Sequence, residues 1–387
     1  MSGSDAVGDG ARLLDAIEAH HPDPFRFVDR DALRRAADRV DQLDDGDPDA
    51  LAVELMRTLA MLGPRNGHTA IHALDDDPTA RRAYPLVLHE FDDGIFVVAA
   101  ERVELVGAQL LAVDGSDVQA VLDAVTPLIA RDNEWTVRAR RPTFVVDAVV
   151  LRGVGVVERG RAATFRLRAP KGATTDVELD PIAIGDHRTG AAGAAWLPSR
   201  PLPAYRCRRT ERHWVAPAPD GTAVHVGYNV TRGDTTAFAR DVEAMVTSSK
   251  CRAVILDLRL NGGGDNRTYQ PVLESLERLA TATRLAVLTS RTTFSAAMQL
   301  VVDLEQRTPA VFVGEPTGGS PNQYGDAIPV ELPRSGRRAH VATIEWLTSG
   351  AGDERLTREP DLRVATGSTS FFSGEDLTLV AALDALS

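Results

Sequence analysis

Apolar residues recur at two different periods along this chain of 387 residues, and the change of period divides it. Residues 31–43 and 49–62 repeat apolar positions every three or four residues, which predicts two amphipathic helices, each with an aspartate placed to cap its start. The pattern then changes to short apolar runs separated by turn residues, at residues 70–74, 85–91, 95–100 and 104–115. These runs predict strands, and helical spacing returns at residues 116–130.

Beyond residue 222, β-branched and apolar runs alternate with helical segments. Strands are predicted at residues 223–230, 253–258, 285–290 and 310–314, and helices around residues 236–246, around residues 268–280 and from Ser295 onward. Such alternation indicates a layered α/β architecture. A chain of this length is too long to fold around one compact hydrophobic core. We therefore expect three parts: a helical segment at 1–65, a β-rich insert at 66–215 and an α/β core at 216–387.

Composition narrows the classes of function. Hydrophobic residues make up 43% and charged residues 25%, as in an ordinary globular protein, and the net charge of −12 argues against a nucleic-acid partner. Cys207 and Cys251 are the only cysteines and have no CxxC spacing, which excludes a thiolate metal site. The start of the chain lacks the pattern of a secretory signal, and no apolar run approaches the roughly 18 residues of a membrane span. A cytoplasmic protein is therefore expected.

Two strand-to-helix turns carry the candidate chemistry. The first, DLRLNGGG at residues 257–264, ends a buried strand in three glycines, which let bare backbone approach a substrate. The second, LTSRTTFSAA, places Ser295 at the start of an alanine-rich helix. A serine there is in itself typical of a helix cap. After an apolar strand, however, it can also be an exposed nucleophile, with the positive helix end beside it to stabilise an oxyanion.

These two motifs and GEPTGG at residues 314–319, in this order, resemble the tail-specific, tricorn-like serine peptidases. The resemblance implies a crotonase-like α/β core and a serine-type endopeptidase that hydrolyses peptide or protein substrates without a cofactor or metal. HPDPF near the start, RDNEW at residues 131–135 and GYNV at residues 227–230 extend it loosely over most of the chain. Residues 107–125 resemble the end of a PDZ-like module, although no carboxylate-binding loop is evident.

The resemblance also assigns the acylation machinery. Ser295 is the nucleophile, and the oxyanion donors are the N–H group of Ala296 and that of Gly262 or Gly263, depending on the register of the turn. Some members use a lysine downstream of the serine, but this chain has no lysine after Lys250.

The tricorn-like branch instead takes a histidine from a GHT-like motif in the N-terminal part. RNGHT provides His68, with Asn-Gly in place of the usual preceding acid. A neutral imidazole is suited to removing a proton from a serine. The acid that orients this imidazole precedes a Pro-Asp pair near the C-terminus, which selects Glu354, with Asp353 and Glu359 as alternatives.

Other assignments complete the expected site. The loop at residues 314–326 is expected to border the substrate groove, with Asn322 and Tyr324 offering hydrogen bonds. His68 and His72 stand four residues apart, but HTAIH lacks the glutamate of HExxH, so no metal is expected. Two other classes compete with a peptidase: a binding protein of the same fold without catalysis, and a crotonase-like acyl-CoA enzyme, which would not explain Ser295.

Overall fold

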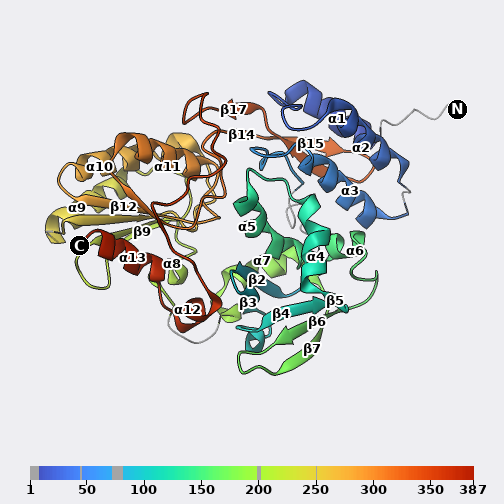
Figure 1. The fold of residues 1–387 in the computed structure, drawn as a ribbon, viewed down its shortest axis with the longest axis horizontal. Helices are drawn as coiled ribbons and strands as arrows, with labels where there is room; N and C mark the ends of the chain where they lie inside the picture. Colours follow the sequence, from blue (N-terminus) through green and yellow to red (C-terminus); the bar gives the residue numbers. More distant parts are fainter. Residues whose placement is uncertain (1–7, 44–45, 72–81, 198–201, 250) are drawn as a thin grey trace. The chain divides into compact units, whose positions relative to one another are not determined.

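The computed structural model describes residues 8–43, 46–71, 82–197, 202–249 and 251–387 (Figure 1). The chain divides into two compact units. Unit 1 comprises Met1–Asp132, Val137–Ser199 and Tyr324–Glu345, and unit 2 comprises Asn133–Thr136, Arg200–Gln323 and Trp346–Ser387. This division differs from the three parts expected, because the helical segment and the β-rich insert form one unit and a late segment of the chain joins them.

Three helices begin unit 1 and pack with a late hairpin. They are α1 (Asp9–His20), α2 (Arg30–Gln42) and α3 (Pro48–Ala60), and the hairpin consists of β15 (Ile328–Leu332) and β16 (Arg337–Val341). The caps are Asp29, which accepts from the Ala32 N–H, and Asp47. The sequence pattern had placed these caps two residues later, because Asp31 and Asp49 also stand beside the apolar repeat. Both of those residues lie in the first helical turn instead.

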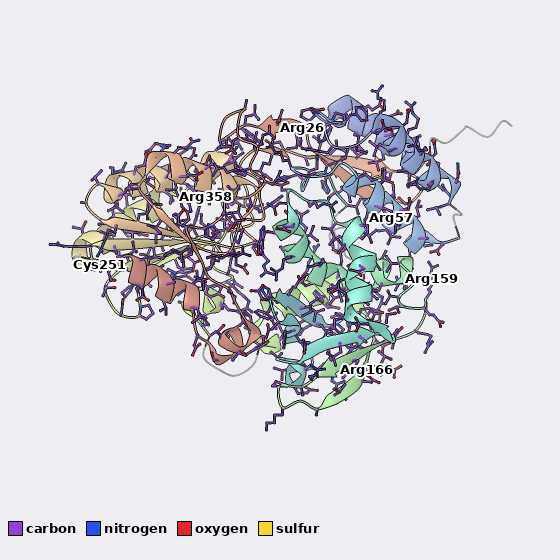
Figure 2. All side chains as sticks on the ribbon, viewed as in Figure 1. Arg26, Arg57, Arg159, Arg166, Cys251 and Arg358 are labelled. Atoms are coloured by element: carbon purple, nitrogen blue, oxygen red, sulfur yellow. The ribbon has the colours of Figure 1, made fainter. Side chains whose placement is uncertain are left out.

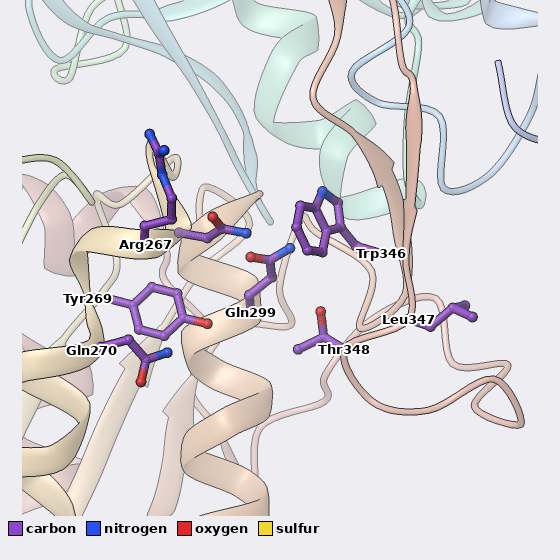
Figure 3. A pocket seen from close by; sticks show the side chains of 8 residues that line it. Arg267, Tyr269, Gln270, Gln299, Trp346, Leu347 and Thr348 are labelled. Atoms are coloured by element: carbon purple, nitrogen blue, oxygen red, sulfur yellow. The ribbon is translucent and has the colours of Figure 1, made fainter. Parts of the chain in front are cut away.

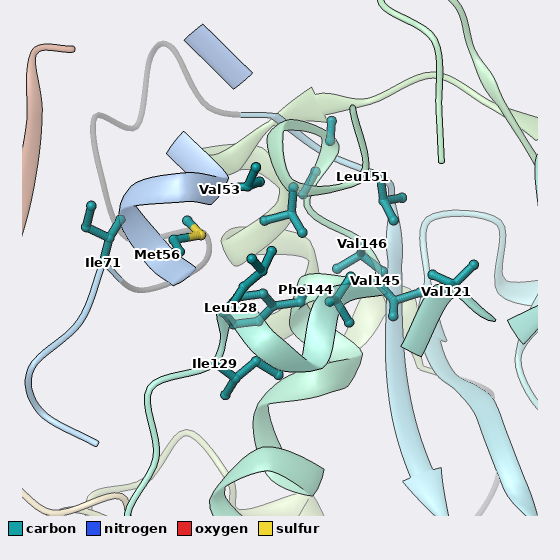
Figure 4. Close-up of a cluster of buried hydrophobic side chains, with 14 of the residues drawn as sticks. Val53, Met56, Ile71, Val121, Leu128, Ile129, Phe144, Val145, Val146 and Leu151 are labelled. Atoms are coloured by element: carbon teal, nitrogen blue, oxygen red, sulfur yellow. The ribbon is translucent and has the colours of Figure 1, made fainter. Parts of the chain in front are cut away.

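The rest of unit 1 is a sheet with helices. Its strand order is β2 (Leu86–Phe91), β3 (Gly94–Ala100), β4 (Gln109–Val113), β6 (Ala163–Arg168) and β7 (Thr174–Leu179), all antiparallel, with β5 (Ser116–Asp117) on β4 and a separate pair of β1 (Arg82–Ala83) and β8 (Ile182–Ala183). Its helices are α4 (Val118–Val125), α5 (Glu134–Phe144) from Val137 onward, α6 (Ala148–Gly153) and α7 (Ile184–Ala192), with the 3₁₀ turns η1 (Val103–Leu105), η2 (Thr126–Leu128) and η3 (Ala194–Trp196). Figure 4 shows Val53 and Met56 of α3 in one buried cluster with Phe144 and Leu151. The segment expected to be β-rich is therefore substantially helical.

Unit 2 is built on a six-stranded sheet. Its order is β18 (Leu362–Arg363), β13 (Val311–Gly314), β12 (Arg284–Thr289), β11 (Ala253–Asp257), β10 (Val224–Tyr228) and β9 (His213–Pro217). The first five strands are parallel and β9 is antiparallel. The predicted strands at 253–258 and 285–289 are confirmed as neighbours in one sheet, with Val254 opposite Leu285.

Helices cover both faces of this sheet. They are α9 (Thr236–Ser249), α10 (Gln270–Ala280), α11 (Ala296–Arg307) and α13 (Leu377–Ala385), with the shorter α8 (Ala204–Cys207), η4 (Asn266–Thr268) and α12 (Ser368–Ser373). Successive strand residues point to opposite faces. Val254 and Leu256 accordingly belong to the core with α9, α10 and α11, whereas Ile255 belongs to the core with Leu379 of α13. The predicted mixed α/β class is confirmed, and a crotonase-like core stays a prediction.

Two short strands, β14 (Gln323–Gly325) and β17 (Ile344–Trp346), pair with each other. Within the described ranges, no helix combines the length and the apolar character needed to cross a membrane.

Candidate active site

Three adjacent parallel strands of unit 2 end in the three motifs singled out from the sequence. β11 leads into DLRLNGGG, β12 into the turn before Ser295, and β13 into GEPTGG. The carboxyl ends of parallel strands meet at one edge of a sheet, which is where ligands of open α/β sheets bind. The motifs therefore converge because of strand order, although they are separate in the sequence.

Ser295 has a backbone conformation that ordinary residues avoid. Its φ is 55° and its ψ is −129°, and α11 begins at the next residue. Such a conformation costs on the order of 1–3 kcal/mol in a residue other than glycine and is typical of functional sites. The Ser295 side chain makes no capping hydrogen bond to α11, so the simple interpretation as a helix cap does not apply. A sharp strand-to-helix turn of this kind holds the nucleophile of α/β-hydrolases.

The glycine loop packs directly against this turn. A Cβ atom at Gly263 would stand 2.5 Å from the Ser295 Cβ and 3.0 Å from the Ala296 nitrogen, and the φ of Gly263 is +102°. A Cβ at Gly264 would stand 1.9 Å from the Thr231 oxygen. Neither position accepts a side chain without movement of the backbone. At Gly262, by contrast, a Cβ would meet nothing within 4 Å.

The backbone N–H groups around Ser295 differ in their hydrogen bonding. The Gly263 N–H donates to the Asn261 Oδ1 at 2.9 Å. The N–H groups of Gly262 and Ala296 have no acceptor among the described residues. Ala296 directly follows Ser295, and Gly262 directly precedes the glycine that packs on Ser295. An oxyanion hole requires backbone donors without an acceptor in the protein, and both N–H groups meet that condition.

Side-chain hydrogen bonds join the glycine loop to the serine turn. Thr293 Oγ1 donates to the Leu258 oxygen at 3.0 Å, and Ser290 Oγ donates to the Arg259 oxygen at 2.7 Å. The Phe294 N–H donates to the Asn261 oxygen at 3.2 Å. The relative position of the two loops is therefore fixed.

A buried charge network supports the base of the glycine loop. Arg259 donates to both oxygens of Asp257 and of Asp376, and His225 Nε2 lies 3.1 Å from Asp257 Oδ2. Burial would raise the pKa of Asp257, but the charge of Arg259 and the hydrogen bond from His225 hold it well below its usual range. All of these charges are paired within the protein, which indicates that Asp257 and Arg259 brace the loop.

The GEPTGG loop supports the serine turn from its other side. A Cβ at Gly318 would stand 2.0 Å from the Arg291 oxygen, and the Gly319 N–H donates to the Thr293 oxygen at 3.0 Å. Asn133 Nδ2 in turn donates to the Thr317 oxygen at 3.1 Å. This contact explains why the RDNEW segment contributes residues to unit 2.

Asn322 has a different role from the substrate contact expected of it. It is fully buried, and its Nδ2 donates to the Gly350 oxygen at 2.7 Å and to the Asp353 oxygen at 3.0 Å. Its Oδ1 accepts from the N–H and the hydroxyl of Ser349. A primary amide has two donors and two acceptor positions. All four are used to hold the loop that carries Asp353, so none remains for a substrate.

Tyr324 also departs from the expected substrate contact. It is fully buried in unit 1, its N–H donates to the Arg65 oxygen at 2.9 Å, and its ring lies 4.5 Å from that of His21. A hydrogen bond links its backbone to His68. Tyr324 therefore supports the histidine loop from within the core.

His68 lies in a tightly bonded loop of unit 1. The Gly67 N–H donates to Asp132 Oδ1 at 2.8 Å, and Arg140 donates to the Gly67 oxygen at 2.9 Å. His68 is partly exposed, but its Nδ1 is buried. Burial and the nearby charge of Arg140 lower the pKa of His68 to about 4, although the hydrogen bond with Tyr324 acts in the opposite direction. The imidazole is thus neutral at neutral pH and can accept a proton.

Sequence reasoning missed the role of His21. Its Nε2 lies 2.6 Å from Asn66 Oδ1, and Asn66 Nδ2 donates to the oxygens of Leu62 and Pro64. Asn66, which replaces the usual acid, thereby anchors the loop before His68. The only sequence signal for His21 was the HPDPF motif, which is part of the family resemblance, but the resemblance assigns no role to this histidine. His72 lies outside the described residues, and no cluster of three or more potential metal ligands occurs among the residues that are described.

The three candidate acids stand on one loop of unit 2. Asp353 is engaged by Arg355, whose Nε and Nη2 donate to its carboxylate, and this arginine lowers the pKa of Asp353 to about 2. Arg355 pairs with Glu305 of α11, and so does Arg358, which is labelled in Figure 2. Glu354 and Glu359 are exposed. Asp353 therefore fastens the loop, which leaves the two glutamates as the accessible carboxylates.

The fold and these turns define an α/β protein with a strained serine between a glycine loop and a helix N-terminus. No family model matches the chain, and no curated protein matches it. Among solved structures, it is similar to mature CPAF, with 14% identity over 96% of both chains and a TM-score of 0.67. At that identity the likeness shows the fold, which spans nearly the whole chain.

Two other solved structures are also similar to this chain. The photosystem II D1 C-terminal processing protease has 16% identity over 93% of this chain and 94% of its own, with a TM-score of 0.44. The tricorn protease has 12% identity over 97% of this chain and 36% of its own, with a TM-score of 0.39. These scores are too low to support an argument.

Proposed function

We propose that this protein is a serine peptidase in which Ser295 attacks the carbonyl carbon of a peptide bond. The observation that carries the proposal is the backbone of Ser295: a strained conformation at the end of β12, with Gly263 in contact and α11 beginning at the next residue. The fold shared with CPAF and the resemblance of the three motifs to tail-specific, tricorn-like peptidases support the same conclusion.

The oxyanion of the tetrahedral intermediate binds the N–H groups of Gly262 and Ala296 in this mechanism. Both lack an acceptor among the described residues, whereas Asn261 already occupies the N–H of Gly263. The positive end of α11 adds to the stabilisation. The register that the sequence left open is therefore assigned to Gly262.

His68 is the general base in this proposal, and Glu354 is the acid that orients it. Both assignments come from the resemblance. The lowered pKa of His68, due to burial and Arg140, supports a neutral imidazole that takes the hydroxyl proton and then donates it to the leaving amine. The engagement of Asp353 by Arg355 favours Glu354 over Asp353. Water then attacks the carbonyl carbon of the acyl-enzyme and gives a proton to His68, which returns that proton to the Ser295 oxygen as the carboxylic acid product leaves, without a cofactor.

A fluorophosphonate probe tests the proposal, because it phosphonylates only an activated serine. We expect a single adduct on the peptide that contains Ser295, loss of the adduct in Ser295→Ala, and strongly slowed labelling in His68→Gln. Hydrolysis of an unfolded protein such as casein should disappear in the same two variants. A wild-type protein that is folded but neither labelled nor hydrolytic would indicate a binding protein of this fold. Labelling elsewhere would reassign the nucleophile.

A further inference from the structure

Unit 2 contains an open pocket of about 640 Å³ beside the start of α11 (Figure 3). One side comes from the segment that follows the glycine loop, and the other from the last residue of β17 and the two residues after it, with Gln299 of α11 also lining the pocket. The described lining residues are Asn266, Arg267, Tyr269, Gln270, Gln299, Trp346, Leu347 and Thr348. The pocket is therefore built from neighbours of the candidate catalytic loops, yet no catalytic assignment uses it.

Gln299 connects the pocket to Ser295. The two residues are one helical turn apart, and the Gln299 N–H donates to the Ser295 oxygen at 3.1 Å. Gln299 therefore stands one turn into α11, the helix whose first residue follows Ser295. A group that occupies this pocket lies beside the N-terminal end of that helix.

The side chain of Gln299 is buried, with only 5% exposed, and Figure 3 shows its amide directed into the pocket near Trp346. Its amide makes no hydrogen bond with any other described residue. The amide atoms are not sealed from solvent, because they are reached through the open pocket. They can therefore exchange hydrogen bonds with water for hydrogen bonds with a ligand.

No charged residue in the described lining of the pocket lacks an oppositely charged partner. Arg267 is its only charged residue, and Asp265 pairs with it through two hydrogen bonds of 2.9 and 2.7 Å. The Tyr269 hydroxyl donates to Asp303 at 2.7 Å. Exposed Leu347 and half-buried Trp346 supply apolar surface. A ligand side chain with an apolar stem and an uncharged polar head fits this composition.

We propose that this pocket is a specificity subsite for a primary-amide side chain, glutamine or asparagine, next to the scissile bond of the substrate. The Gln299 amide has donors and an acceptor, and a second primary amide satisfies both at once. Trp346 and Leu347 contact the methylene stem. The inference rests on the proposed peptidase function and names the class of residue that its substrate presents.

Peptide kinetics provide the first test. Fluorogenic peptides that differ at one position near the scissile bond, with glutamine, leucine, glutamate or lysine there, are compared by kcat/KM. We expect at least a tenfold preference of the wild type for glutamine over each of the others at one position. Gln299→Leu, of similar volume, should reverse the order of glutamine and leucine. Gln270→Leu, a matched change at an exposed lining residue, should leave the order unchanged.

A binding measurement separates failure of the subsite from failure of the peptidase function. In Ser295→Ala, the NMR signals of the Gln299 side-chain amide, assigned by their loss in Gln299→Leu, are followed during titration with N-acetylglutamine methylamide. We expect these signals to shift, and N-acetylleucine methylamide to leave them in place. A shift without any peptide hydrolysis by the wild type retains the pocket and rejects the peptidase. Signals that neither compound moves, or an unchanged peptide preference in Gln299→Leu, overturn the subsite.

Discussion

Gly263 and Ser295 stand so close that a Cβ atom at position 263 would lie 2.5 Å from the Ser295 Cβ. The glycine loop and the serine turn are therefore packed tightly together, with the backbone of Gly263 in contact with the side chain of Ser295. Gly262, whose N–H has no acceptor in the described structure, directly precedes this contact in the chain.

Gly263→Ala should destabilise the protein and abolish peptide hydrolysis. The new methyl group would meet Ser295 and adopt a φ of +102°, where side chains are strained. Gly262→Ala is the matched control, because its Cβ would meet nothing within 4 Å. Urea unfolding should show a loss of more than about 1 kcal/mol for Gly263→Ala and a change within about 0.5 kcal/mol for Gly262→Ala. Equal stability of the two variants would contradict the close packing.

Ser295 should show a conflict between stability and activity. Ser295→Ala should lower kcat on the order of 10⁶-fold, as nucleophile loss does in triad enzymes. Ser295→Gly should be equally inactive but more stable than Ser295→Ala by about 1 kcal/mol, because glycine adopts a φ of 55° with a ψ of −129° without strain. Thermal and urea unfolding of the two variants measure this difference. A Ser295→Gly variant less stable than Ser295→Ala would show that the turn is not strained.

Stability should depend on pH through His68. An unfolded histidine titrates near pH 6.5, whereas the pKa of folded His68 is about 4. Between these values the unfolded state binds the proton and the folded state does not, so stability falls as the pH falls. At pH 5 the expected loss relative to pH 7 is about 2 kcal/mol. Unfolding at both pH values should therefore show a smaller acid-induced loss in His68→Gln.

The exposed residue His20 provides the control for this measurement, since His20→Gln should retain the full pH dependence of the wild type. If His68 is also the general base, the acidic limb of the kcat/KM profile should lie near pH 4 instead of near pH 6.5. A limb near 6.5 would mean that another group accepts the serine proton.

The three acids of one loop should differ in what their removal does. Glu354→Gln should lower kcat by on the order of 10⁴-fold, as loss of the orienting acid does in a serine triad, with unfolding unchanged because Glu354 is exposed. Asp353→Asn should instead destabilise the loop, because it removes the charge that holds Arg355. Glu359→Gln should alter neither. Full activity in Glu354→Gln together with its loss in Glu359→Gln would move the acid to Glu359.

Much of unit 2 could be predicted because its signals are local. A run such as AVILDL is apolar on both sides of its strand, and the structure pairs β11 with β12 as expected. Helix spacing located α11 and put Ser295 directly before it. The helix caps were misplaced by two residues, because several aspartates stood beside the apolar repeat and only the folded chain selects Asp29 and Asp47.

The sequence by itself determined the α/β class, the order of the strands and helices that carry the three motifs, and Ser295 as the candidate nucleophile. These features could be predicted because the strand period of two residues and the helix period of 3.6 residues depend only on neighbouring positions in the sequence. The tertiary structure decided which polar groups are already satisfied. The side-chain amide of Asn322 is hydrogen-bonded to Gly350 and Asp353, and the N–H group of Gly263 is hydrogen-bonded to Asn261. The side-chain amide of Gln299 has no hydrogen-bond partner among the described residues. Hydrogen-bond partners that loops bring together from distant positions produce no periodic pattern in the sequence, so only the folded structure identifies them.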